Sequence, residues 1–227
     1  DRLVMKPLGM QGLVAAVVTP MTDDGELNLE LVPGIVDHLV ANEIRGIYIA
    51  GSTGEGMSLS DEERMATAAA YLKHCKGRMK AVVQVGHNSM KAAAALASHA
   101  EECGADAISA TPTGYFQAEG ESGLVGLMAV IAEAAPATPF YYYHIPILSG
   151  ASMNPMSFTE LAAKEIPTFC GITYTDAGTS YNLSSLQRVG PGLEFLSGTD
   201  EAYLQSLAQG YEGAVGSTYN YAAPLYP

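Results

Sequence analysis

The sequence predicts an α/β fold in which eight parallel strands close into a (β/α)8 barrel, or TIM barrel, as a single domain over residues 1–227. Eight short apolar runs have the length and composition of buried parallel strands. Seven stretches with helical spacing of apolar residues alternate with them, and no linker interrupts the series. Strict alternation indicates right-handed crossovers between parallel strands, and eight units favour a closed barrel over an open doubly wound sheet.

Each strand is placed by an apolar run that ends in glycine, proline or a hydroxyl-bearing residue. The expected strands are 12–20, 46–50, 80–86, 105–110, 139–144, 168–174, 193–197 and 213–218. The expected helices are at about 28–42, 61–75, 89–104, 123–134, 157–164, 184–189 and 200–210. In a barrel of this kind, functional residues lie at the C-terminal ends of the strands.

Side chains that can cap a helix support these boundaries. The expected N-terminal caps are Asn28, Ser60, Ser89, Ser157, Ser184 and Asp200. Ser60 and Ser157 are each followed three residues later by glutamate, which is the pattern of a capping box. Gly77, Gly104 and Gly210 are placed to end the helices before them.

Only residues 219–227 follow the eighth predicted strand, whereas a closed barrel has a helix after every strand. We therefore expect a barrel truncated after strand eight, before its last helices, unless another segment covers strands eight and one. Without a cover, several hundred Å² of apolar wall would be exposed, which soluble monomers rarely tolerate.

Composition excludes several classes of partner. The chain has 227 residues and a formal net charge of −13, which argues against binding to nucleic acid or to an anionic membrane surface. Its three cysteines are an odd number without C-x-x-C spacing, which is typical of reduced thiols. With no signal-peptide pattern and no apolar run approaching about 20 residues, we expect a cytoplasmic protein.

Motifs for metals and common cofactors are missing from the sequence. The five histidines are scattered without metal-ligand spacing. There is no Walker loop, no Rossmann fingerprint and no Gly-x-Ser-x-Gly elbow. We therefore expect neither a metal nor a cofactor.

The turn at residues 51–56, GSTGEG, lies between the second strand and the helix that Ser60 caps. Its backbone N–H groups and the hydroxyls of Ser52 and Thr53 suit a small anion, and a carboxylate fits better than a triphosphate because no Gly-Lys-Ser/Thr follows. The alternative is a plain strand–helix turn whose glycines adopt positive φ. The hexapeptide alone leaves both interpretations open.

Hydroxyl side chains and two adjacent carboxylates gather at the predicted strand ends. They are Ser52, Thr53, Tyr143, Thr173, Thr175 and Ser217, together with Asp200 and Glu201. Hydroxyls can donate hydrogen bonds to a carboxylate, and carboxylates can accept them from sugar hydroxyls. The strand ends therefore predict a site for a polyhydroxylated acid.

Four motifs occupy these strand ends: GSTGE at 51–55, YHIP at 143–146, GTDE at 198–201 and GAVGSTYN at 213–220. Together they resemble the N-acetylneuraminate lyases, a branch of the dihydrodipicolinate synthase family of class I, Schiff-base aldolases. The similarity runs in register from the first strand to the eighth. It implies cleavage of N-acetylneuraminate, a sialic acid, to N-acetylmannosamine and pyruvate, without added cofactor, by a homotetramer.

The resemblance also implies a role for each matching residue. Ser52 and Thr53 would hold the carboxylate of pyruvate or of the sialic acid, and Tyr143 would relay a proton to and from the C4 hydroxyl of the open-chain sugar. The residues that would line the polyol pocket are Thr175, Gly198, Asp200, Glu201 and Ser217. Without the resemblance, Asp200 is a helix cap and Tyr143 a packing residue in a strand.

Thr173 departs from the family pattern. The family carries a lysine near the end of strand six, in a Gly-hydrophobic-Lys pattern, where this chain has Gly171, Ile172 and Thr173. A threonine cannot form an imine, so no iminium is available to accept the electrons released by C–C cleavage. Lys164, the nearest lysine in sequence, precedes the strand and would emerge at the wrong end of the barrel.

Several interpretations of Thr173 stay open. The lysine was replaced on purpose to trap substrate, or the change is natural and leaves a non-catalytic pseudoenzyme that binds sialic acid or another keto acid. Alternatively, Tyr143 serves a reaction that needs no imine, or the chain is an inactive fragment.

Overall fold

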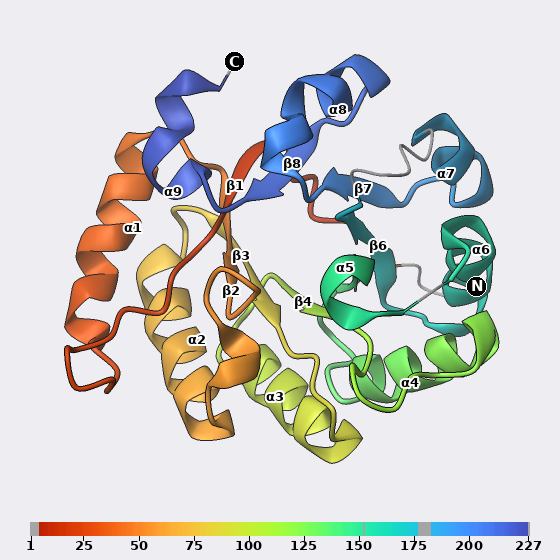
Figure 1. Cartoon of the computed structure of the whole chain (residues 1–227), viewed down its shortest axis with the longest axis horizontal. Coiled ribbons are helices and arrows are strands. Elements are labelled where there is room, and N and C mark those ends of the chain that lie inside the picture. Colours follow the sequence, from red (N-terminus) through yellow and green to blue (C-terminus); the bar gives the residue numbers. More distant parts are fainter. Residues whose placement is uncertain (1–4, 152, 177–182, 227) are drawn as a thin grey trace.

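Eight parallel strands close into a barrel in the computed structural model, which describes residues 5–151, 153–176 and 183–226 (Figure 1). Each strand pairs with the next, and β1 also pairs with β8. The strands are β1 (Gly12–Ala16), β2 (Gly46–Ile49), β3 (Lys80–Gln84), β4 (Ala107–Ala110), β5 (Phe140–His144), β6 (Phe169–Tyr174), β7 (Glu194–Ser197) and β8 (Gly213–Gly216). The predicted (β/α)8 barrel is confirmed, and every strand lies within its predicted range.

Helices surround the ring of strands (Figure 1). They are α1 (Val32–Ala41), α2 (Asp61–Cys75), α3 (Met90–Glu102), α4 (Gly120–Glu133), α5 (Pro146–Ser149), α6 (Pro155–Glu165), α7 (Leu183–Val189), α8 (Tyr203–Gln209) and α9 (Tyr219–Ala222). Short 3-10 turns are η1 (Leu29–Leu31), η2 (Gly56–Ser58), η3 (Asp200–Ala202) and η4 (Ala223–Leu225). Within the described residues, no helix combines the length and the apolar composition needed to cross a membrane.

Two helices begin at the caps that the sequence predicts. Ser60 Oγ accepts the Glu63 N–H at 3.2 Å, and Glu63 Oε2 accepts the Ser60 N–H at 2.8 Å, which completes the capping box of α2. Gly77, with a φ of 73°, follows the end of that helix in the left-handed conformation. Ser89 Oγ accepts the Ala92 N–H at 3.3 Å at the start of α3.

The predicted caps at Asn28 and Ser157 are wrong. Asn28 makes no capping hydrogen bond and precedes η1 rather than an α-helix. Helix α6 begins before Ser157, at Pro155, because Asn154 Oδ1 accepts the N–H groups of Met156 and Ser157. The fixed φ of proline also favours the first helical position. Ser157 is consequently an internal residue of the first turn.

The predicted cap at Asp200 is also wrong. Asp200 is the first residue of η3, and its carboxylate accepts hydrogen bonds from Thr218, which follows β8. Ser184, another predicted cap, lies inside α7, which begins at Leu183; the residue before Leu183 lies outside the described part of the chain.

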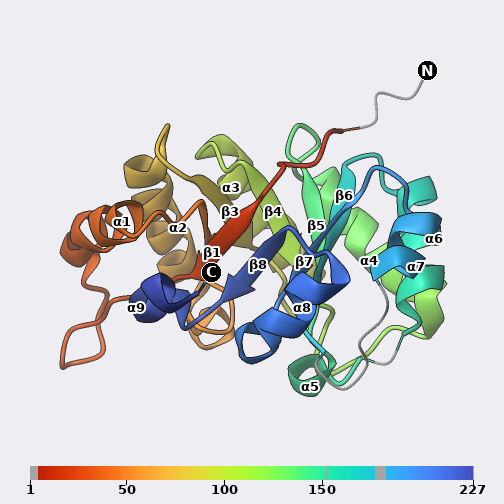
Figure 2. The same ribbon diagram turned by 90° about the horizontal axis from the view of Figure 1, so that it is seen from above.

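The strands are shorter than predicted, because the polar and proline residues that end each apolar run belong to the loops. The first strand ends at Ala16, so Thr19 and Pro20 lie in the loop after it. The sequence did not predict α5, although Pro146 was expected to stop strand five. That proline instead begins a single helical turn, where its fixed φ fits. Helix α5 and the N-terminal segment lie at opposite ends of the barrel (Figure 2).

The barrel interior is filled by side chains and closed at its N-terminal end by the segment before β1. The buried inner residues are Met10, Val14, Ala16, Tyr48, Val82, Ala107, Tyr141, Cys170, Leu196 and Val215. The Tyr141 phenol donates to Glu194 Oε2 at 2.5 Å and accepts the Leu8 N–H at 2.9 Å. These bonds tie the N-terminal segment to β5 and β7.

The seam between β8 and β1 is covered by the residues after β8. Strand β8 is buried along its whole length, and Ala15 of β1 is fully buried. Tyr219 of α9 and Ala223 of η4 belong to the same buried outer cluster as Ala15 and Ala214. The residues after β8 therefore cover this seam with one short helix and a 3-10 turn, in place of the full-length helix that follows most of the other strands. The expected truncation after strand eight agrees with this short cover, whereas the expected exposed wall is not found among the described residues of the seam. The apolar side chains that are exposed nearby are Leu204, Tyr221 and Leu225.

Candidate functional site

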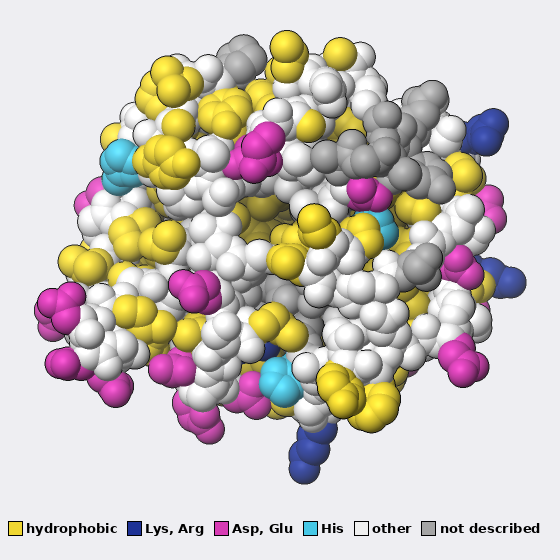
Figure 3. Space-filling model, viewed as in Figure 1, with side chains coloured by type: hydrophobic (Ala, Val, Ile, Leu, Met, Phe, Trp, Pro, Cys, Tyr) yellow, Lys and Arg dark blue, Asp and Glu magenta, His cyan; other side chains and the backbone are white. Residues whose placement is uncertain are grey.

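A cavity of about 210 Å³ opens at the C-terminal ends of the strands. It is lined by Ala16, Tyr48, Ser52, Thr53, Tyr143, Ile145, Thr173, Thr175, Gly198, Thr199, Asp200, Glu201, Val215, Gly216 and Ser217. Figure 3 shows the face at this end of the barrel, which is hollowed near its centre. The fold thus brings residues from six strand ends, separated widely in the sequence, to one small space.

All nine residues that the sequence singled out line this cavity: Ser52, Thr53, Tyr143, Thr173, Thr175, Gly198, Asp200, Glu201 and Ser217. Sequence reasoning missed the residues that share it, among them Tyr48, Ile145 and Thr199. Tyr48 and Ile145 lie in or next to strands that are apolar on both faces. Such strands lack the alternation that tells which side chains point inward.

Tyr143 lies at the centre of the hydroxyl groups. Its phenol oxygen is 3.3 Å from Ser52 Oγ, which joins the end of β5 to the turn after β2. Its ring packs edge to face against Tyr48, with centroids 5.4 Å apart. Burial raises the pKa of the Tyr143 phenol, and the Ser52 and Thr175 hydroxyls partly offset that rise. Tyr143 is therefore a neutral hydroxyl near pH 7, able both to donate and to accept a hydrogen bond.

Thr173 lies directly beside Tyr143, because the two residues are register partners in the parallel pairing of β5 and β6. Its side chain is 2% exposed. All six lysines of the chain lie among the described residues, and none of them lines the cavity. Lys80, for example, is at the first position of β3, at the far end of the barrel, where it pairs with Asp106 at 3.0 Å.

The glycines of the GSTGEG turn are required by close packing and not by positive φ. In this turn the left-handed conformation belongs to Ala50 and Glu55, with φ values of 54° and 53°. A Cβ on Gly56 would lie 2.0 Å from the Ala50 carbonyl oxygen, and one on Gly54 would lie 2.9 Å from the Val17 carbonyl oxygen. Of the two interpretations left open for this turn, the one that assigned its glycines to positive φ is wrong, because backbone contacts leave no room for a side chain.

Asp200 is buried and firmly held. Its Oδ2 atom accepts hydrogen bonds from the Thr218 N–H at 2.8 Å and the Thr218 hydroxyl at 2.7 Å. Burial alone raises the pKa of the Asp200 carboxyl, but these hydrogen bonds outweigh it, so the pKa lies below its usual value. The cavity therefore carries an ionised carboxylate at its β7 side. Gly198 is needed beside it, because a Cβ there would lie 1.9 Å from Thr175 Oγ1.

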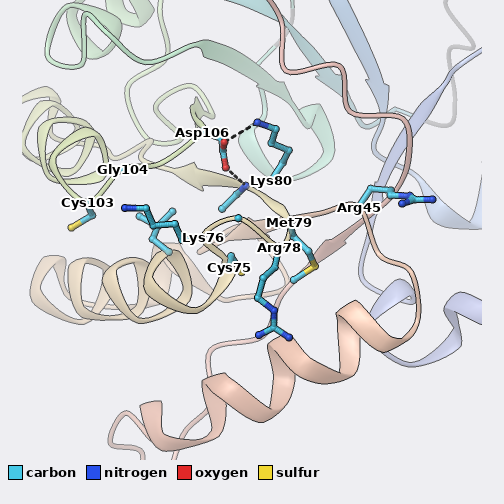
Figure 4. Close-up of a pocket in the computed structure, with 12 residues that line it drawn as sticks. Arg45, Cys75, Lys76, Arg78, Met79, Lys80, Cys103, Gly104 and Asp106 are labelled. Atoms are coloured by element: carbon cyan, nitrogen blue, oxygen red, sulfur yellow. Dashed lines mark hydrogen bonds and ion pairs between the residues drawn. The ribbon is translucent and has the colours of Figure 1, made fainter.

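A larger hollow of about 540 Å³ lies at the opposite, N-terminal end of the barrel. Its cationic lining residues are Arg45, Lys76, Arg78 and Lys80. Figure 4 shows that these side chains point in different directions. Arg78 pairs with Asp37 at 2.7 Å and Lys80 with Asp106 at 3.0 Å. This hollow therefore lacks a set of convergent groups, and the smaller cavity is the better candidate for function.

Among the residues that the structure describes, no three His, Cys, Asp or Glu side chains are grouped to hold a metal ion. The titratable groups of the cavity are the phenols of Tyr48 and Tyr143 and the carboxylates of Asp200 and Glu201. Burial keeps the pKa of the Tyr48 phenol well above its usual value. The arrangement offers hydroxyls for proton transfer and for holding an anion, and carboxylates for accepting hydrogen bonds from alcohols.

A model of the Dihydrodipicolinate synthetase family matches residues 9–226. The chain belongs to this family. The N-acetylneuraminate lyase of Xenopus tropicalis is 41% identical over 215 residues, which are 93% of this chain and 70% of that protein. The structure of Proteus mirabilis N-acetylneuraminate lyase superposes with a TM-score of 0.92 at 36% identity, over 96% of this chain and 73% of that one.

A third similar protein, Ruminococcus gnavus sialic acid aldolase, was solved as a catalytic lysine mutant. It has a TM-score of 0.88 and 29% identity, over 95% of this chain and 70% of that one. Membership of the Dihydrodipicolinate synthetase family, and similarity to its N-acetylneuraminate lyases, confirm the resemblance that four strand-end motifs indicated. The chain is thus an N-acetylneuraminate lyase-like member of an aldolase family.

Proposed function

We propose that the cavity binds the keto-acid end of N-acetylneuraminate or pyruvate, in a site of the N-acetylneuraminate lyase type whose Schiff-base position is occupied by Thr173. The observation that carries this proposal is the convergence of all nine predicted residues on one cavity of about 210 Å³. That volume is below the roughly 300–1,000 Å³ typical of drug-sized ligand sites, and it suits a small keto acid with a chain extending toward solvent.

Each group has a task in this proposal. The hydroxyls of Ser52 and Thr53, with backbone N–H groups of their turn, hold the ligand carboxylate, since the part of the cavity lining that the structure describes contains no cationic side chain. Asp200, Glu201 and Ser217 bind the polyol chain, because carboxylates accept hydrogen bonds from alcohols. Tyr143 relays the proton of the C4 hydroxyl when the C3–C4 bond breaks: its neutral phenol accepts that proton and passes its own to C3 of the enolate, which becomes pyruvate. The reverse reaction runs the same relay backwards.

Thr173 should make cleavage of the ligand slow. When the C3–C4 bond breaks, its electron pair must move toward C2 of the keto acid. A lysine at position 173 would receive that pair in a cationic iminium, whereas a threonine leaves it on the C2 oxygen as an enolate. Among the described residues, no Lys, Arg or His side chain lines the cavity to stabilise that charge. We therefore propose that the chain binds its ligands better than it cleaves them.

The second candidate function is a non-catalytic sensor or binder of sialic acid or another keto acid. The positions of the lysines favour it, because all six lie among the described residues and none of them lines the cavity to supply an amine in place of Thr173. The Ruminococcus gnavus catalytic lysine mutant has the same fold, so the barrel itself does not depend on that lysine. We further propose a cytoplasmic homotetramer without a cofactor, on the strength of the family resemblance.

Binding and covalent capture distinguish these functions. Isothermal titration calorimetry should detect pyruvate and N-acetylneuraminate, and both should raise the melting temperature. Treatment with borohydride in the presence of pyruvate should leave the protein mass unchanged. A covalent adduct would instead show an active amine and refute the assignment of position 173. If neither ligand binds, the proposed function is wrong.

A further inference from the structure

Tyr226 is connected to the Asp200 carboxylate through one intervening side chain. The Tyr226 phenol oxygen lies 2.6 Å from Thr218 Oγ1, which lies 2.7 Å from Asp200 Oδ2. The single proton of the Thr218 hydroxyl is donated to the carboxylate, so the Thr218 oxygen must accept from the Tyr226 phenol. The chain of donors therefore runs from Tyr226 through Thr218 to Asp200.

Ring packing fixes the Tyr226 phenol. The ring meets Tyr219 edge to face, with centroids 4.7 Å apart and an interplanar angle of 90°. It also meets Tyr203 at 5.6 Å and 72°. Tyr203 belongs to α8, which follows η3, and Tyr219 belongs to α9. Two tyrosines from two other segments thus hold the Tyr226 donor in place on the outside of the seam between β8 and β1.

The Asp200 side chain has little room to move, because Gly216 and Tyr219 pack closely against it. A Cβ on Gly216 would lie 2.7 Å from Asp200 Cβ and 2.8 Å from the Tyr219 ring, which shows how closely the three residues approach. Asp200 is 7% exposed and lines the cavity. Because hydrogen bonds in a chain polarise one another, the Tyr226 phenol strengthens the bond from Thr218 to the carboxylate.

We propose that Tyr226 is a positioning residue that acts through Thr218 to orient the Asp200 carboxylate toward the alcohol groups of the ligand. This inference rests on the proposed function, and it adds a determinant of specificity outside the cavity. Tyr226 does not line the cavity and touches no ligand. It acts on the polyol end of the ligand, while Ser52 and Thr53, carried by the turn after β2, hold the keto-acid end.

The test compares two ligands that share the keto-acid end. Tyr226→Phe removes one hydroxyl and keeps the ring that packs on Tyr219. Titration calorimetry should show N-acetylneuraminate affinity reduced about three- to tenfold, the range expected for one hydrogen bond, with pyruvate affinity unchanged. Tyr221→Phe is the matched control, because Tyr221 lies in the same short segment and is 75% exposed. Its affinities for both ligands should equal those of the parent chain.

A pH profile separates positioning from simple structural support. The groups that face the Asp200 carboxylate are the Thr218 N–H and hydroxyl, the Ser217 hydroxyl at 3.5 Å, the Glu201 side chain and the Tyr219 phenol. Loss of the Tyr226 donor weakens the bond from the Thr218 hydroxyl, and that bond lowers the Asp200 pKa. Binding of N-acetylneuraminate by Tyr226→Phe should therefore be lost at higher pH than in the parent chain. Thr218→Val removes the hydroxyl that bonds to both Tyr226 and Asp200, so it should reduce N-acetylneuraminate affinity further. Thr218→Ser keeps that hydroxyl and should bind N-acetylneuraminate as well as the parent chain does.

The possible outcomes are distinct. If the parent chain binds both ligands and Tyr226→Phe binds both equally well, the inference is overturned and the proposed function stands. Equal weakening of both ligands by Tyr226→Phe would also overturn it, because it would indicate general damage to the barrel. If the parent chain binds neither ligand, the proposed function fails, and the inference fails with it.

Discussion

Tyr143 and Thr173 are register partners on the neighbouring parallel strands β5 and β6, and both side chains line the same cavity. Paired residues of a parallel sheet project to the same face. A longer side chain at position 173 would therefore extend alongside the Tyr143 phenol, in the direction of Ser52, whose hydroxyl lies 3.3 Å from that phenol. This relationship supports the proposal that an amine at position 173 would meet the keto group of a bound ligand.

We predict that Thr173→Lys creates or greatly increases aldolase activity. The new amine can form an imine with the keto group, and the iminium accepts the electrons released by C–C cleavage. Loss of a covalent nucleophile commonly costs about 10³-fold or more, so pyruvate release from N-acetylneuraminate should rise by at least about that factor. Borohydride should then reduce the imine formed with pyruvate and leave one 1-carboxyethyl group on the protein.

Thr173→Met is the matched control, because its side chain has similar length and no amine. It should release pyruvate no faster than the parent chain. If Thr173→Lys folds, binds pyruvate and yet shows neither activity nor adduct, position 173 is not the Schiff-base position.

In the Thr173→Lys background, we predict that Tyr143→Phe lowers kcat by about 10²- to 10⁴-fold with little change in KM. The substitution removes only the phenol hydroxyl, which is the proposed proton-transfer group, and general acid–base catalysis contributes a factor of about that size. Tyr142→Phe is the control, since Tyr142 neighbours Tyr143 on β5 but belongs to the outer cluster of the barrel. An equal loss in the two variants would contradict a proton-transfer role for Tyr143.

The sequence sufficed for the barrel because its strands are apolar runs that alternate strictly with helical patterns. The buried apolar runs predicted where the strands lie but not which of their side chains point into the barrel. Tyr48 was therefore not predicted to line the cavity. Loop ends were harder. Ser157 and Asp200 are residues of the types that cap helices. However, Asn154 accepts the Ser157 N–H and caps the helix instead, and the Asp200 carboxylate is bonded to Thr218 and not to the first turn of a helix. Such competition depends on tertiary contacts, which local pattern does not contain.

The GSTGEG turn shows a second limit. One of the two interpretations of this turn explained its glycines by positive φ, whereas Gly54 and Gly56 are required by the approach of two carbonyl oxygens, from Val17 and Ala50. Val17 lies in the loop after β1, far from the turn in sequence. A contact of this kind is visible only once the barrel has closed and brought the ends of β1 and β2 together.

We predict that Gly56→Ala destabilises the fold by about 3 kcal/mol or more. The added Cβ would lie 2.0 Å from the Ala50 carbonyl oxygen, and because that contact is with backbone, relief requires the turn to move. Gly34→Ala in α1 is the control. A Cβ there meets nothing within 4 Å, and alanine favours a helix interior by about 0.5–1 kcal/mol. Urea unfolding of the two variants measures the difference, and equal stabilities would contradict the packing argument.

The last prediction concerns His144, which is buried on β5 and stacks on Tyr174 with ring centroids 4.8 Å apart. Burial lowers the pKa of His144 to about 4, although the Asp176 carboxylate acts in the opposite direction. Below its unfolded pKa of about 6.5, the unfolded chain binds a proton that the folded chain does not. Stability contributed by neutral His144 is therefore complete above about pH 6.5 and declines as the pH falls toward 4.

The decline should reach up to about 3 kcal/mol near pH 4, since each unit of pKa shift corresponds to about 1.4 kcal/mol. His144→Phe keeps an aromatic ring against Tyr174 and removes the titrating group, so its unfolding free energy should fall less between pH 7 and pH 4. His74→Gln, at a half-exposed position of α2, should follow the parent chain. Urea denaturation across this range decides the matter: parallel curves for His144→Phe and the parent chain would show that His144 does not set the acid sensitivity of the barrel.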